Sequence, residues 1–143
     1  MNDVDEMRMW YGKQVITVLV VSEISDIRIL IHDLLNREGY SVFGASNAVE
    51  VFDLVNRIGH PHLAILDILL PGQLGIDVAE KLNIEKAVPI LFMTTFSEQE
   101  NKLLESSPSM NEFIRKPMNP IELVTRVRSV LLRAARPRYE RQL

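Results

Sequence analysis

The sequence alternates between two apolar patterns, and this alternation constrains the fold more than any other feature. Short runs rich in β-branched residues, such as VITVLVV at residues 15–21, are continuous, as strands buried on both faces are. Between these runs, apolar residues recur at helical spacing. The expected strands are residues 15–21, 40–43, 62–66, 89–93 and 112–115. The expected helices begin at Ser25 as the N-cap, near Ser46 or Asn47, at about Ile76, at about Ser97 and at Asn119–Pro120.

Strict alternation of five strands and five helices predicts an α/β fold, in which a doubly wound five-stranded parallel sheet carries helices on both faces. The 143 residues suit one domain with one sizeable core. Within it, Gly39 is expected to stop the first helix and Pro108 to end the fourth. Residues 1–14 and 136–143 lie outside the pattern and are expected to be flexible ends of a domain at residues 15–135.

Composition excludes several kinds of site. The chain has no cysteine, so it can form neither a disulfide framework nor a thiolate metal site. No apolar run reaches the roughly 18 residues of a membrane span, and no signal-peptide pattern opens the sequence. We therefore expect a soluble, cytoplasmic protein without membrane contact. The net charge of −3 conceals a basic end after residue 114. Without a helix-turn-helix or zinc-finger signature, this end does not predict direct nucleic-acid binding.

Polar residues follow the expected strands at the points where ligands bind in such folds. The functional crevice of an open parallel sheet lies beyond the carboxyl ends of its strands. The residues that follow these strands are Ser22 and Glu23, Asp67, Thr94 and Thr95, and Lys116. A pair of carboxylates can hold Mg²⁺, which prefers oxygen ligands. A hydroxyl and an ammonium group can bind phosphoryl oxygens, so the sequence predicts a site for phosphate chemistry at this edge.

Four segments at these positions together resemble the receiver domain of two-component response regulators, over about residues 15–135. They are VLVVSE at 18–23, LDILLPGQLG at 66–75, PILFMTT at 89–95 and FIRKP at 113–117. The resemblance implies a flavodoxin-like receiver fold. It also implies a phosphorylation-dependent signalling switch, which catalyses only its own phosphorylation and dephosphorylation and is not otherwise an enzyme.

The resemblance assigns the central role to Asp67, which would accept a phosphoryl group from the phosphohistidine of a sensor histidine kinase or of a phosphotransfer protein. Thr94 and Lys116 would bind the phosphoryl oxygens. Phe113 would be the aromatic residue that changes position with Thr94 when the switch is thrown. The family also has a cis peptide at the position of Lys116 and Pro117.

The cofactor implied by the resemblance is Mg²⁺. Glu23, Asp67 and the main-chain carbonyl of Leu69 would hold the ion, and Ser22 would act through a bound water. The family normally has two adjacent acids where this chain has Ser22 and Glu23. A serine hydroxyl brings no charge, so we expect Mg²⁺ affinity to be lower than with two carboxylates.

Three further residues would flank the phosphoryl group by resemblance, namely Leu69, Thr95 and Phe96. The output surface would be formed by the fourth helix, fifth strand and fifth helix of the receiver domain, from Ser97 to Ala135. A homodimer or an effector partner could use this surface.

Two alternatives to a phosphorylated switch stay open. Because of the departure at Ser22 and Glu23, the chain could be a phosphorylation-independent pseudo-receiver that acts as a protein-binding module. It could also be a flavodoxin-like protein that binds a small ligand. The second alternative is weak, because the sequence has no GxGxxG or GxxxxGK[ST] motif to cradle phosphate.

Overall fold

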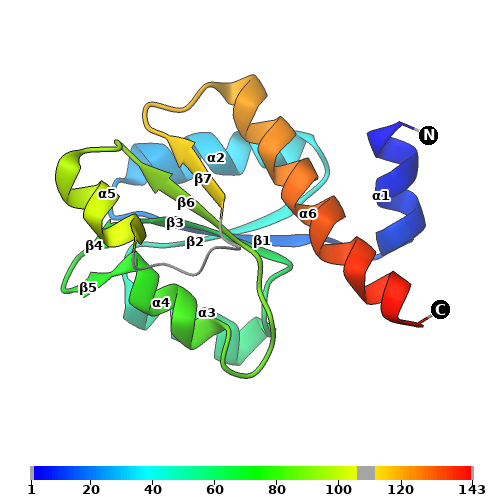
Figure 1. Ribbon diagram of the computed structural model, residues 1–143, viewed down its shortest axis with the longest axis horizontal. Helices are drawn as coiled ribbons and strands as arrows, with labels where there is room; N and C mark the ends of the chain where they lie inside the picture. Colours follow the sequence, from blue (N-terminus) through cyan, green and yellow to red (C-terminus); the bar gives the residue numbers. More distant parts are fainter. Residues whose placement is uncertain (1, 106–111, 143) are drawn as a thin grey trace.

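The computed structural model describes residues 2–105 and 112–142. Its main sheet has five parallel strands in the order β2-β1-β3-β6-β7 (Figure 1). The strands are β1 (Thr17–Val21), β2 (Ser41–Ala45), β3 (Leu63–Asp67), β6 (Ile90–Thr94) and β7 (Glu112–Arg115). The predicted α/β fold with a five-stranded parallel sheet is confirmed, and β3 is the central strand.

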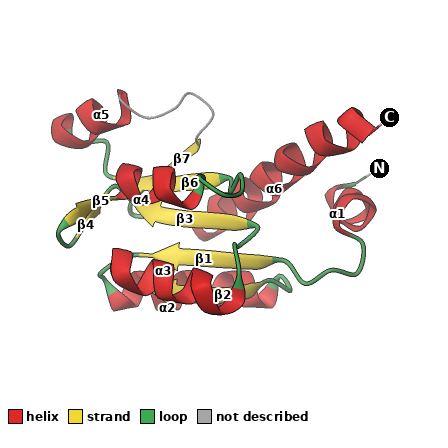
Figure 2. Cartoon of the chain, turned by 90° about the horizontal axis from the view of Figure 1, so that it is seen from below, coloured by secondary structure: helices red, strands yellow, loops and turns green. Residues whose placement is uncertain are grey.

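Helices cover both faces of this sheet (Figures 1 and 2). Apolar residues of α2 (Ser25–Arg37) and α6 (Pro120–Gln142) pack on one face. Those of α3 (Ala48–Ile58), α4 (Gly75–Leu82) and α5 (Glu98–Glu105) pack on the other. No helix in the described part of the chain is both long enough and apolar enough to cross a membrane.

Successive residues of a strand contribute side chains alternately to the two apolar clusters, one on each face of the sheet. In β3, Leu63 and Ile65 join the cluster beneath α2 and α6, whereas Ala64 and Leu66 join the cluster beneath α3 and α4. All four side chains are fully buried. This explains the continuous apolar runs in the sequence, since a strand covered on both faces needs apolar side chains at every position.

Helix and strand boundaries differ from the sequence predictions by one or two residues at several points. Asp67 and Thr94 are the last residues of β3 and β6, not the residues after them. The prediction of Ser25 as an N-cap is wrong: the cap is Ile24, which is extended and whose carbonyl accepts the Arg28 N–H. Ser25 is already helical.

Several predicted helix ends are confirmed. The Asn47 side chain accepts a hydrogen bond from Glu50 N at 3.0 Å and caps α3. The Asn119 side chain accepts from the backbone at the start of α6 in the same way. Gly39 lies just beyond α2 with φ of +92°, a conformation that suits glycine. The expected stop at Pro108 lies outside the described residues.

A short hairpin between β3 and α4 was not predicted. β4 (Leu69–Leu70) pairs antiparallel with β5 (Gln73–Leu74). The turn between them is Pro71–Gly72, and Gly72 has φ of +71°. A proline followed by a glycine of positive φ is typical of a type II turn, so the sequence did carry the signal for this hairpin.

Both ends of the chain depart from the expected flexible segments. Residues 3–11 form α1 (Asp3–Tyr11), which begins at the N-cap Asn2 and ends at Gly12. At the other end, α6 continues to Gln142 and so includes residues 136–142. The two helices pack against each other, because Met7 and Tyr11 of α1 join the apolar cluster beneath α6 (Figure 2).

Polar contacts fix α1 on α6. The Tyr11 hydroxyl donates a hydrogen bond of 2.6 Å to the Leu131 carbonyl, and Arg136 Nε donates one of 2.6 Å to a Glu6 carboxylate oxygen. The hydrogen bond from Arg136 lowers the pKa of Glu6 below its ordinary value. These contacts join residues about 120 positions apart or more, so sequence periodicity could not reveal them.

The Tyr11 contact gives a test of this docking. Tyr11→Phe keeps the ring but leaves the partly buried Leu131 carbonyl without this donor, so we expect the free energy of unfolding to fall by about 1 kcal/mol. Urea denaturation measures the change. An unchanged transition midpoint would contradict a stabilising role for this hydrogen bond.

Candidate functional site

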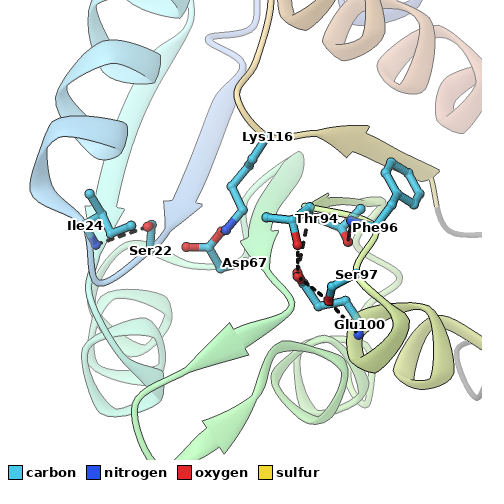
Figure 3. A network of polar contacts seen from close by, with 9 residues as sticks. Ser22, Ile24, Asp67, Thr94, Phe96, Ser97, Glu100 and Lys116 are labelled. Atoms are coloured by element: carbon cyan, nitrogen blue, oxygen red, sulfur yellow. Dashed lines mark hydrogen bonds and ion pairs between the residues drawn. The ribbon is translucent and has the colours of Figure 1, made fainter.

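The carboxyl ends of the parallel strands bring four of the predicted site residues to one edge of the sheet (Figure 3). Asp67 ends β3, Thr94 ends β6, Ser22 follows β1 and Lys116 follows β7. Ser22 and Thr94 are completely buried, and Asp67 is almost completely so. Buried polar groups need partners, and the contacts that these residues make determine what the edge can do.

The Asp67 carboxylate and the Lys116 ammonium form the central contact of this edge. Lys116 Nζ lies 2.8 Å from Asp67 Oδ1, a short charge-assisted hydrogen bond (Figure 3). The Asp67 side chain is 4% exposed and that of Lys116 is 20% exposed. Removing one partner of such a pair would leave the other buried and uncompensated, so the two residues form a unit.

The backbone around Asp67 is held by a very close approach of Gly75, the first residue of α4. Gly75 N donates a hydrogen bond of 2.7 Å to the Ile68 carbonyl. A Cβ atom at Gly75 would lie 2.0 Å from the Asp67 carbonyl oxygen, closer than any side chain can come. Glycine at position 75 therefore allows α4 to begin directly against the strand that carries Asp67.

Ser22 and Glu23 behave differently from each other. Ser22 Oγ accepts a hydrogen bond of 3.2 Å from Ile24 N, and Arg28 Nη1 donates one of 2.6 Å to the Ser22 carbonyl. Glu23 is exposed. The Ser22 side chain faces the same edge as Asp67 (Figure 3).

The side chains at this edge offer oxygen ligands, which suit a hard cation such as Mg²⁺, although few such side chains are present. Among the described residues, no three His, Cys, Asp or Glu side chains gather as a metal site would require. Mg²⁺ does not need such a cluster, because it commonly binds through one or two carboxylates and retains water or phosphate oxygens. At this edge Asp67 supplies a carboxylate and Ser22 a hydroxyl, both of them oxygen ligands for such an ion.

The residues after β6 form a tight turn. Thr94 Oγ1 accepts a hydrogen bond of 2.9 Å from Phe96 N, and Phe96 adopts the left-handed conformation with φ of +56°. The Phe96 ring points away from Asp67 (Figure 3), and the Arg115 guanidinium lies 4.7 Å from the ring centre. A cation–π contact holds the Phe96 ring toward β7 in this structure, and its place beside the phosphoryl group stays a prediction.

Glu100 is a further polar residue near this turn that the sequence analysis missed. It is 6% exposed, and its carboxylate accepts hydrogen bonds from the Thr95 hydroxyl and from Ser97 Oγ, the latter at 3.1 Å. Burial acts to raise the pKa of Glu100, but these hydrogen bonds and the charge of Lys116 together lower it below its ordinary value. The spacing Ser97-x-x-Glu100 at the start of α5 matches a capping box and was the available signal.

A model of the response regulator receiver domain matches residues 18–128. The chain belongs to the response regulator receiver domain family. This membership places it in two-component signal transduction, where receiver domains act through phosphorylation.

Curated relatives agree with the family assignment. The receiver domain is 33% identical over 122 residues to the transcriptional regulatory protein ResD of Bacillus subtilis, with 85% of this chain and 50% of that protein covered. It is 36% identical over 117 residues to a probable transcriptional regulator, ycf27, of Pyropia yezoensis, with coverages of 82% and 48%. The chain thus spans about half the length of these relatives.

Solved structures agree as well. The receiver domain is similar to a putative response regulator from Chloroflexus aurantiacus, with 27% identity, a TM-score of 0.71, and 82% and 98% of the two chains covered. It is also similar to the chemotaxis response regulator CheY4 of Vibrio cholerae, with 25% identity, a TM-score of 0.69, and coverages of 82% and 99%.

The remaining predicted residues of the receiver domain lie around this centre. Phe113 of β7 stacks on Phe92 of β6, with ring centres 6.0 Å apart. The peptide bond between Lys116 and Pro117 is cis, as the family resemblance implied. Leu69 lies in the hairpin that follows Asp67 and is 42% exposed.

Proposed function

We propose that this receiver domain accepts a phosphoryl group on Asp67 from the phosphohistidine of a sensor histidine kinase or a phosphotransfer protein. The observation that carries the proposal is the Asp67–Lys116 pair at the end of the central strand, with 2.8 Å between Oδ1 and Nζ. A carboxylate oxygen of Asp67 attacks the phosphorus. The phosphorus–nitrogen bond then breaks, the imidazole leaves with the electron pair, and an acyl phosphate forms.

Phosphoryl transfer asks mainly for positioning and for positive charge around the transferred group. Lys116 contributes an ammonium that is already beside Asp67 and can contact the phosphoryl oxygens. Thr94 contributes a hydroxyl at the end of the neighbouring strand β6, and its use requires the bond from Phe96 N to be released or shared. Leu69, Thr95 and Phe96 are the residues proposed to flank the group.

Mg²⁺ is the proposed cofactor. Asp67, Glu23 and the main-chain carbonyl of Leu69 would hold it, and Ser22 would act through water. When bound, the ion supplies positive charge that stabilises the phosphoryl oxygens in the transition state. The exposed side chain of Glu23 is one methylene longer than that of an aspartate, so it must fold back toward Asp67 to reach the same Mg²⁺ ion.

The output of the switch is proposed to be a changed surface on α5, β7 and α6. Charged contacts already link two of these elements, since Glu112 of β7 pairs with Arg126 at 3.6 Å and with Arg133, both on α6. Thr94 and Phe113 lie on adjacent strands, as a coupled pair requires. Because the relatives named above are transcriptional regulators of twice the length, we propose that this surface controls an effector or a dimer. We do not assign nucleic-acid binding to this domain.

The test of the proposal is intact mass spectrometry after incubation with acetyl phosphate, with and without millimolar Mg²⁺. We expect the mass to increase by one phosphoryl group only when Mg²⁺ is present. Peptide mapping should then place the modification on the peptide that contains Asp67. No gain in mass with Mg²⁺ present, and none from a phosphohistidine donor, would favour the pseudo-receiver alternative, for which the replacement of a family acid by Ser22 is the supporting observation.

Ser22 gives a prediction about the metal. The buried hydroxyl brings no charge, whereas an aspartate there can still accept from Ile24 N and also face the ion. Ser22→Asp is therefore expected to raise Mg²⁺ affinity by roughly tenfold, the scale of an added ligand or outer-shell partner. Calorimetric titration measures it. Ser22→Ala is the control, and equal affinities for Ser22→Asp and wild type would mean that position 22 is not beside the ion.

A further inference from the structure

Thr94, the last residue of β6, and the next three residues, to Ser97, form a turn. We call it the switch turn, because the proposed switch residue Thr94 begins it. The turn is closed by a local contact, in which Phe96 N donates a hydrogen bond of 2.9 Å to Thr94 Oγ1. This bond holds the side chain of Thr94, whose hydroxyl the proposed function needs at the phosphoryl group. The hydroxyl hydrogen can still donate to a phosphoryl oxygen, but a movement of Thr94 toward phosphorylated Asp67 has to break or rearrange the bond from Phe96 N.

The switch turn is braced from α5 by Glu100. The Glu100 carboxylate accepts from the Thr95 hydroxyl, from Thr95 N at 3.4 Å and from Ser97 Oγ at 3.1 Å. These partners lie on either side of Phe96, and Figure 3 shows Glu100 aimed at the turn. Because Glu100 is 6% exposed, water can replace little of what these donors provide.

Two further contacts hold Phe96 itself. Asn101 Nδ2 donates a hydrogen bond of 3.2 Å to the Phe96 carbonyl, and Arg115 lies against the Phe96 ring. Phe96 has a φ of +56°, a backbone conformation that residues other than glycine rarely adopt. A residue in this conformation persists only where its surroundings determine it, and here Glu100, Asn101 and Arg115 do so.

We infer that Glu100 is a positioning residue that holds the switch turn in the arrangement seen here and so opposes the movement of Thr94 toward phosphorylated Asp67. The inference rests on the proposed function and deepens it. Glu100 acts on the switch turn through the hydrogen bond that the Thr95 hydroxyl donates to its carboxylate. Loosening this contact raises the population of molecules in which Thr94 is available, and the rate of phosphorylation rises with that population.

The variants distinguish the effect of the Thr95 hydroxyl from the effect of the size and shape of its side chain. Thr95→Val removes the donor and keeps the volume, whereas Thr95→Ser keeps the donor. Glu100→Gln keeps the size of the acceptor and removes its charge. The matched control is Thr125→Val, because Thr125 is an exposed residue of α6 whose hydroxyl donates to the Ile121 carbonyl, away from the switch turn.

The first measurement needs no phosphorylation. NMR hydrogen exchange of the Phe96 amide reports directly whether the turn has loosened. We expect exchange to be about three- to tenfold faster in Thr95→Val and Glu100→Gln, as the loss of a modest hydrogen bond implies, and unchanged in Thr95→Ser and Thr125→Val. Equal exchange in Thr95→Val and wild type would overturn the inference.

The second measurement is the rate of phosphorylation by acetyl phosphate with Mg²⁺. We expect Thr95→Val and Glu100→Gln to be phosphorylated about three- to tenfold faster than wild type, with unchanged Mg²⁺ affinity, and Thr125→Val to match wild type. An unchanged or slower rate in Glu100→Gln would overturn the inference. If wild type takes up no phosphoryl group, the proposed function fails, and the exchange of the Phe96 amide still decides whether Glu100 holds the turn.

Discussion

Replacing Asp67 with asparagine is expected to abolish phosphoryl uptake completely. The amide of asparagine is a poor nucleophile and cannot form a stable acyl phosphate, whereas the carboxylate of Asp67 lies beside the Lys116 ammonium at 2.8 Å. Intact mass after incubation with acetyl phosphate and Mg²⁺ measures the loss. Asparagine can still accept a hydrogen bond from Lys116, so the fold should survive and the result should report on chemistry.

The matched control for this variant is Asp77→Asn. Asp77 is an exposed residue in the first turn of α4, only ten positions further along the chain. The change in charge is the same, but it falls on an exposed helix residue and not on the buried carboxylate beside Lys116. We expect Asp77→Asn to be phosphorylated at the wild-type rate. Continued uptake by Asp67→Asn would move the phosphoryl acceptor to another side chain.

Replacing Gly75 with alanine is expected to have the largest effect on stability. The new Cβ atom would lie 2.0 Å from the Asp67 carbonyl oxygen and 3.0 Å from the Asp67 carbonyl carbon. Both are backbone atoms of the central strand and cannot rotate away. We expect the free energy of unfolding to fall by roughly 2–3 kcal/mol, the cost of overpacking a well-packed core. Phosphoryl uptake should slow as well, because the backbone that positions Asp67 must shift.

Gly44→Ala separates this steric effect from the general effect of removing a glycine. The atoms nearest to a Cβ atom at Gly44 would belong to the Arg28 side chain, the closest at 3.5 Å, which is ordinary contact. Gly44 lies within β2, where alanine is no worse than glycine. Urea denaturation of both variants should leave Gly44→Ala within about 0.5 kcal/mol of wild type. A Gly75→Ala protein as stable as Gly44→Ala would contradict the close packing of α4 on Asp67.

The fold class and the central residues of the site could be predicted from the sequence, because both follow from short-range patterns. Apolar runs alternating with helical periodicity required a parallel sheet, and the rule that ligands meet the carboxyl ends of strands selected Asp67, Thr94 and Lys116 without knowledge of any distance. The structure places all three at one edge and brings Lys116 to Asp67. Strand and helix boundaries shifted by a residue or two because local propensity does not fix where hydrogen bonding begins.

The features that escaped sequence reasoning depend on contacts between segments that the chain brings together only when it folds. Nothing in the sequence indicated that the Phe96 ring lies against Arg115 of β7. The first residues looked like a loose end, yet Tyr11 reaches Leu131 on α6. Whether such contacts form is decided by packing and by the burial of polar groups, which periodicity does not encode. The sequence by itself determined the fold class and the edge at which the chemistry lies. Only the tertiary structure decided which side chains face Asp67, which brace the switch turn and which ends of the chain are ordered.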